Sequence, residues 1–187
     1  MVVLAVTSGA GSIAYLYESW KARAVLETRR LGLPAYAANG LRHSLAAADT
    51  YATLRQIGLP VDRAARIVER LGQLNEYKEF YLRPRRRRDP TREIYKDLYN
   101  NAVGIFAAVK LEGDGRFAMT DRLTFLGRMT ARNVVLHIFT DPRVPDFPDG
   151  SRPEASDLAL ALATFRRDRR TAYGPIMAAL AIAPTGE

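Results

Sequence analysis

The feature that most constrains the fold is a helical periodicity that runs through most of the chain. Apolar residues recur every three or four positions in one segment after another, and alternating apolar–polar runs are nearly absent. A period near 3.6 places apolar side chains on one face of a helix, whereas a half-buried strand needs a period of two. We therefore predict an all-α fold, a single-domain bundle of about six to seven helices.

Glycine, proline and capping residues divide this pattern into segments. Helices are expected over residues 18–31, 39–57, 62–82, 91–111, 120–139, 154–167 and 172–183. Asn39, Asp62 and Thr91 are the expected N-caps, because their side chains accept hydrogen bonds from the first-turn N–H groups. Trp20 is expected to anchor the first helix. The organisation is then an apolar N-terminal segment (1–17), a helical core domain (18–140), a loop (141–153) and a C-terminal helical segment (154–187).

Two loops with distinct compositions separate these helices. The first, residues 83–90, holds two prolines and four consecutive arginines, Arg85, Arg86, Arg87 and Arg88. Such a run does not pack as a helix interior, so we predict an exposed basic loop that binds anions through arginine forks, or else a solvated linker. The second, residues 140–153, is rich in proline and aspartate. Its aspartate spacing does not match a calcium loop, so no metal site is predicted.

Composition restricts the possible functions. The chain has 187 residues, a net charge of +8 and no cysteine. The charge favours an acidic partner, such as an anionic substrate, nucleic acid or a membrane surface. The lack of cysteine excludes disulfides and thiolate-bound zinc, and two histidines are too few for a three-histidine metal site. We find no nucleotide-binding or catalytic sequence motif, and we predict no cofactor.

The first 17 residues carry no charge. They are slightly too short for a membrane span and lack the basic region of a secretory signal. Three interpretations stay open: a buried strand or helix, a weak membrane anchor over residues 2–17, or an export signal. The sequence leaves the compartment undetermined and slightly favours the cytoplasm.

Two stretches place polar residues inside apolar helical patterns, residues 39–49 and 97–104. In the second stretch, Gly104 and Ala108 share a stripe with Asp97 and Asn101, and their small side chains allow a neighbouring helix to approach closely. Small residues beside His43 offer a matching wall. We therefore predict that these two helices touch, with His43 near the contact.

Side chains gathered at this contact suggest acid–base chemistry. A histidine with a pKa near neutrality suits proton transfer, so His43 is the candidate general base, oriented by Asp97 or Asp49. Asn75 is expected to face inward on the third helix. Its neighbour Glu76 is the candidate second acid, because it can reach the same cleft.

Substrate-binding groups are expected on the same two helices. Arg42 and the amides of Asn100 and Asn101 are candidate donors to an anionic or carbonyl group. The alternative is a satisfied core hydrogen-bond network that only fixes the packing. We expect His137, which falls on an inward face of the fifth helix, to be a satisfied core residue of that kind.

The order of these polar residues resembles the signature of an uncharacterised family of bacterial helical domains. In this chain the signature is Asn39-x-x-Arg42-His43, then Asn75-Glu76, then Asp97-Leu98-Tyr99-Asn100-Asn101-x-x-Gly104. The family commonly has a histidine where this chain has Asn75, which argues against a shared metal site. Members occur alone or as C-terminal modules of secreted and toxin-like proteins, and the family implies no established activity.

Two classes of function therefore stay open, and the sequence does not decide whether the protein is an enzyme. The first is a hydrolase-like or toxin-like domain built on His43. The second is a non-enzymatic basic module that binds nucleic acid, an anionic membrane or a phage or membrane assembly through residues 83–92 and 166–170. A protein partner for the apolar C-terminal helix is a further expectation.

Overall fold

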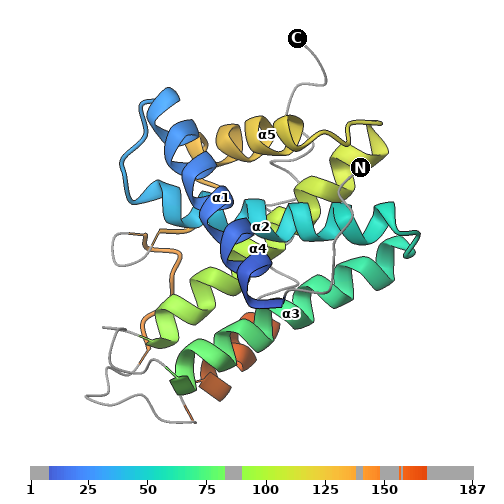
Figure 1. The fold of residues 1–187 in the computed structure, drawn as a ribbon. Coiled ribbons are helices and arrows are strands. Elements are labelled where there is room, and N and C mark those ends of the chain that lie inside the picture. Colours follow the sequence, from blue (N-terminus) through green and yellow to red (C-terminus); the bar gives the residue numbers. More distant parts are fainter. Residues whose placement is uncertain (1–8, 83–89, 138–140, 148–155, 157, 168–187) are drawn as a thin grey trace.

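The structure, a computed structural model, describes residues 9–82, 90–137, 141–147, 156 and 158–167. All regular structure in these ranges is helical and comprises α1 (Gly9–Arg30), α2 (Ala37–Gln56), α3 (Val61–Leu82), α4 (Pro90–Gly113), α5 (Met119–Ala131) and a further helix over residues 158–167 (Figure 1). This confirms the predicted all-α bundle. The arginine run at 85–88 and the predicted helix at 172–183 lie outside the described residues.

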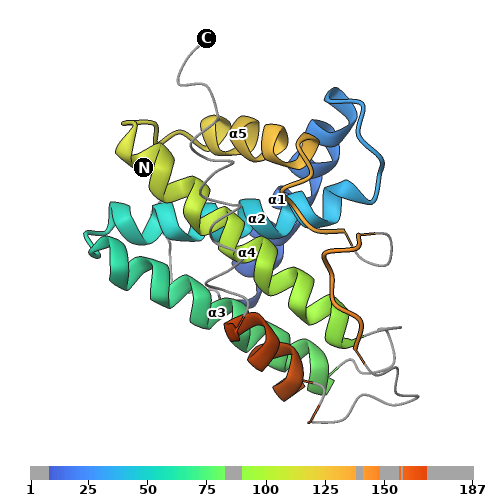
Figure 2. The same ribbon diagram turned by 180° about the vertical axis from the view of Figure 1, so that it is seen from behind.

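The central element of the bundle is α2, which packs against α1, α3, α4 and α5 (Figures 1 and 2). Its buried residues are mostly small or apolar and lie on several sides of the helix: Ala37, Ala38, Gly40, Leu41, Ser44, Leu45, Ala47, Ala48, Asp49, Tyr51 and Ala52. A helix that is apolar on most sides is stable only when neighbours surround it. The largest buried side chains of α2, Leu41, Leu45 and Tyr51, form the middle of the core.

The N-terminal helix is longer than predicted. It begins at Gly9 rather than at residue 18, so residues 9–17 of the uncharged segment are helical. Trp20 on this helix packs against the core, as expected, and its Nε1 donates to Asp49 Oδ2 at 2.9 Å. Within the described residues, no helix combines the length and the apolar character that a membrane crossing requires.

The three predicted N-caps lie inside their helices instead. The helices begin earlier, at Ala37, Val61 and Pro90, so Asn39, Asp62 and Thr91 fall in first turns. Pro90 is suited to the first helical position, because the N–H that it lacks would have no intrahelical partner there.

The fifth helix ends eight residues earlier than predicted, at Ala131. Asn133 adopts a left-handed conformation with φ 56°, and the N–H groups of Asn133 and Val134 donate to the carbonyls of Thr130 and Met129, both at 3.0 Å. This pair of bonds is a Schellman motif, in which asparagine is the usual substitute for glycine. The chain therefore leaves the helix, and residues 135–137 cross the start of α2.

Candidate functional site

The predicted contact between the two polar stretches is confirmed. A Cβ added at Gly104 of α4 would overlap the backbone carbonyl of Ser44 on α2, so only glycine allows this approach. The Ser44 hydroxyl also donates to the backbone oxygen of Asn100 at 2.9 Å. Residues that are 56 positions apart in the chain are thereby fixed face to face.

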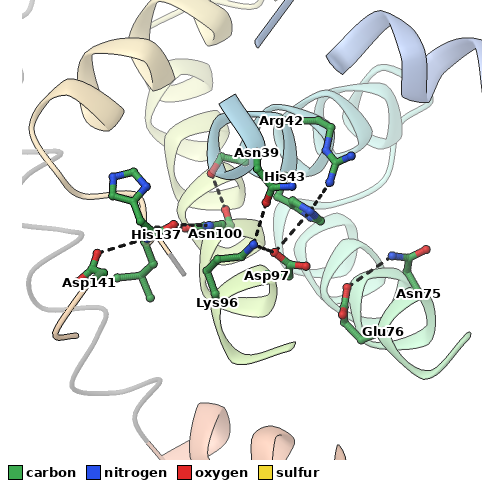
Figure 3. Close-up of polar contacts among 12 residues, drawn as sticks. Asn39, Arg42, His43, Asn75, Glu76, Lys96, Asp97, Asn100, His137 and Asp141 are labelled. Atoms are coloured by element: carbon green, nitrogen blue, oxygen red, sulfur yellow. Dashed lines mark hydrogen bonds and ion pairs between the residues drawn. The ribbon is translucent and has the colours of Figure 1, made fainter. Parts of the chain in front are cut away.

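Next to this contact, Asn100 links α4 to the segment that follows α5. Its Nδ2 donates to the carbonyl of Leu136 at 3.2 Å, and its Oδ1 accepts from the Leu136 N–H at 2.9 Å (Figure 3). The side chain is completely buried. Because both ends of the amide are bonded to backbone, Asn100 acts here as a structural clamp, and we do not include it among the substrate-binding groups proposed below.

His43 lies one residue before Ser44 and faces α4. Its Nε2 is 3.4 Å from Asp97 Oδ1 and 2.7 Å from an Nη atom of Arg42. A guanidinium group can only donate, so a neutral His43 accepts this hydrogen bond at Nε2 and carries its proton on Nδ1. The His43 side chain is 16% exposed, which leaves its edge within reach of solvent.

Lys96, which the apolar periodicity did not indicate, is a further partner of Asp97. Its Nζ lies 2.8 Å from Asp97 Oδ1 and donates to Asn39 Oδ1, also at 2.8 Å (Figure 3). Lys96 is buried. A buried ammonium is tolerated only with an opposite charge and hydrogen-bond acceptors, and Asp97 and Asn39 supply them.

The first helix also reaches this site. Arg42 lies over the Tyr17 ring, with Cζ 4.7 Å from the ring centroid, and donates a hydrogen bond to the Tyr17 hydroxyl. Tyr17 is exposed, and Arg42 is partly so. The guanidinium group therefore forms the solvent side of the cluster, and His43 and Asp97 lie beneath it.

The candidate residues of α3 are arranged differently from the prediction. Asn75, expected to face inward, is exposed, whereas Glu76 is 1% exposed. Asn75 Nδ2 lies 3.5 Å from Glu76 Oε1 (Figure 3). The Asn101 amide of α4 also faces α3, because a Cβ added at Gly72 would be only 2.7 Å from its Nδ2. Asn101 thus belongs to the contact between α3 and α4, and Glu76 is buried on α3.

Asp49, the alternative partner for His43, belongs to a separate cluster. Its Oδ1 accepts from Arg122 Nε of α5 at 2.6 Å, and its Oδ2 accepts from Trp20 of α1 at 2.9 Å. Asp49 and Arg122 are both buried. Asp49 therefore joins α1, α2 and α5, and Asp97 is the carboxylate that lies beside His43.

The second histidine lies after the early end of α5 rather than on that helix. The His137 ring contacts the edge of Tyr36 with centroids 5.1 Å apart, and its backbone N–H donates to Asp141 at 3.3 Å. Burial lowers the pKa of His137, which favours the neutral imidazole. Its Nδ1 is buried without a hydrogen-bond partner among the described residues, and the satisfied core role stays a prediction.

Comparisons with known proteins do not assign this chain to a family. No protein-family model, curated protein sequence or solved structure matches the chain. Among the described residues, no group of three or more histidine and carboxylate side chains is arranged to hold a metal ion. The chemistry of the site is therefore inferred from its own side chains.

Proposed function

We propose that the protein is a small hydrolase-like domain in which His43 is the general base and the substrate is anionic. The observation that supports this most is the position of His43 Nε2, which lies between a carboxylate and a guanidinium at a partly exposed edge of the bundle. Proton transfer needs a group that titrates near neutral pH within hydrogen-bond reach of its partners.

Each neighbour has a proposed role in this chemistry. Asp97, whose charge is compensated by Lys96 at 2.8 Å, stabilises the imidazolium that forms when His43 takes a proton. Arg42 binds the anionic group of the substrate. When the guanidinium turns toward that group, it releases the Nε2 lone pair of His43. Glu76 on α3 stays the proposed second acid. Asn101 stays a proposed hydrogen-bond donor to the substrate.

The test is a panel of chromogenic esters that includes phosphate mono- and diesters and a carboxylic ester. The wild-type protein should hydrolyse at least one of them, and His43→Gln should lower its kcat by about 10²–10⁴-fold. His137→Gln is the matched control, since it removes the other histidine and should retain activity. Equal rates for wild type and His43→Gln would remove His43 as the base, and a wild type inert on every ester would contradict the proposal.

A non-enzymatic helical module is the second candidate, and the buried contacts of the same cluster favour it. Lys96 pairs with Asp97, and Asn100 is held by Leu136, as expected of a network that only fixes the packing. In that case His43→Gln would change stability without removing any activity. The resemblance to the helical family with toxin-like members fits both candidates and stays a prediction.

A further inference from the structure

The outer face of α3 carries a line of exposed side chains that the His43 site does not use. At about 100° per residue, Arg63, Arg66, Arg70, Tyr77 and Tyr81 fall within an arc of roughly 60°. All five are exposed. They extend over about 27 Å of helix at 1.5 Å per residue. The arginines occupy the first half of this line and the tyrosines the second.

The arginine half is hollowed. Arg63, Arg66 and Arg70 line an open depression of about 400 Å³ together with Ile67 and Leu71. None of the three guanidinium groups has an ion pair or hydrogen bond with any residue that the structure describes. The surface of this depression is mostly apolar, so it does not itself suit phosphate. Arginine forks bind phosphate oxygens with paired N–H donors, so the three exposed guanidinium groups beside the depression suit a phosphodiester backbone.

The tyrosine half presents aromatic surface. The rings of Tyr77 and Tyr81 stack with centroids 6.4 Å apart and planes 13° from parallel. Tyr77 is 40% exposed and Tyr81 58% exposed. Unpaired bases stack on exposed aromatic rings, whereas the bases of a duplex are already stacked on one another.

The distribution of charge around the line favours the same partner. Asp62 and Glu69 fall outside the arc, and Glu79 lies on the opposite side of α3, toward its buried face. The arginine-rich sequence at 83–88 follows directly after α3. A helix that lies on a membrane keeps its cations on the polar face, away from the middle of its apolar face. Here the arginines and tyrosines share one line.

We propose that this face of α3 binds single-stranded nucleic acid, with phosphates on the three exposed arginines and bases on the two tyrosines. The inference is independent of the His43 site. Figures 1 and 2 show α3 at the outer edge of the bundle, with α2 and α4 on its inner side.

The first experiment measures the anisotropy of a labelled oligothymidine of about 15 nucleotides as a function of salt. The triple variant Arg63→Ala, Arg66→Ala, Arg70→Ala should bind at least about 10-fold more weakly. Its salt slope should be smaller by about 2, at 0.7 per phosphate contact. The matched control is Arg29→Ala, Arg128→Ala, Arg132→Ala, which removes the same charge from exposed positions elsewhere and should keep most of the affinity and slope.

The second experiment tests the stacking step separately. The double variant Tyr77→Ala, Tyr81→Ala should lose about 10-fold or more in affinity with an unchanged salt slope, because stacking releases no counterions. His43→Gln should bind like wild type. Thermal melts by circular dichroism establish that each variant is folded.

Three results would overturn the proposal. One is no binding by the wild type at low salt, and another is equal weakening by both arginine triples. The third is that the wild type binds a duplex of the same length more tightly than the single strand, and that Tyr77→Ala, Tyr81→Ala does not change the affinity for the duplex. Vesicles with anionic phospholipid are run in parallel. Binding to vesicles without binding to the oligonucleotide would assign the face to a membrane surface and exclude nucleic acid.

Discussion

Each half of α2 contributes to a cluster of charged side chains, and the two clusters differ in how their groups are paired. In the cluster at the C-terminal half each charged group has a matched partner. There, both oxygens of Asp49 accept short hydrogen bonds, from Arg122 at 2.6 Å and Trp20 at 2.9 Å. Further along, Tyr51 and Arg55 both donate hydrogen bonds to the carboxylate of Glu112 on α4. These contacts join the helices and leave no group with competing partners.

In the N-terminal half the partners compete. Asp97 Oδ1 is 2.8 Å from Lys96 and 3.4 Å from His43, and His43 Nε2 is also 2.7 Å from Arg42. One oxygen thus lies near both an ammonium group and an imidazole, and one ring nitrogen lies near both a cation and an anion. The comparison teaches that competition for partners distinguishes a candidate site from a structural cluster better than burial does.

The largest effect is expected at the matched pair. Arg122→Met leaves the buried Asp49 carboxylate without its cation, which should lower the free energy of unfolding by about 3–5 kcal/mol. Urea denaturation measures this. Arg128→Met, at an exposed position of the same helix, is the control and should change stability by no more than about 0.5 kcal/mol. If Arg122→Met lowers the free energy of unfolding by less than about 1 kcal/mol, the matched pair of the C-terminal half would not differ in stability from the competing contacts of the N-terminal half.

The next effect concerns the contact that holds the N-terminal half in place. Gly104→Ala inserts a methyl group against the Ser44 carbonyl and should cost about 1–3 kcal/mol, since backbone must move to relieve the overlap. Gly113→Ala on the same helix meets no atom within 4 Å and should be neutral or slightly stabilising. Similar denaturation midpoints for the two variants would show that α2 and α4 separate at little cost.

A smaller effect with a distinct pH dependence is expected at Glu112. It accepts from Tyr51 at 2.6 Å and from Arg55 at 2.7 Å, and the Arg55 hydrogen bond lowers the pKa of Glu112. A carboxyl whose pKa is lowered on folding stabilises the protein above its unfolded pKa and loses that contribution as pH falls through the folded pKa. Glu112→Gln should therefore cost about 1–2 kcal/mol at pH 7 and little at about pH 3.

Denaturation of wild type and Glu112→Gln across this pH range measures the difference between them. A difference that stays constant from pH 7 to pH 3 would contradict the assignment of the lowered pKa to the native state.

The smallest effect on stability is expected at His43. In His43→Gln an amide oxygen can still accept from Arg42, and the site is partly exposed, so the loss should be below about 1 kcal/mol. A loss above about 2 kcal/mol would place His43 with the matched groups of the other half and would favour the structural interpretation of the cluster.

Helical periodicity was sufficient to predict the fold class, the central position of α2 and its contact with α4. It was insufficient to predict the position of Lys96, because the pattern of apolar and small residues along the fourth helix does not include a lysine. Lys96, Asn100, Val103 and Ala107 share a stripe at i, i+4, i+7 and i+11, and all four are buried. Tracing every stripe, including those with charges, would have placed Lys96 beside α2.

Two details that depend on a single residue were also predicted wrongly: the inward-facing residue of α3 and the end of α5. One step along a helix turns the side chain by about 100°, so the rotation of α3 against its neighbours decides whether Asn75 or Glu76 faces inward. Similarly, the end of α5 depends on the left-handed conformation of Asn133, which asparagine adopts only in some contexts.

The sequence by itself determined the all-α class and which helix has to lie in the middle, because apolar spacing and small residues act locally along each helix. Only the tertiary structure decided which carboxylate each cation meets: Asp49 goes to Arg122, and Asp97 is divided between Lys96 and His43. Such pairings depend on the rotation and offset of whole helices, and those are fixed by packing contacts between residues far apart in the chain.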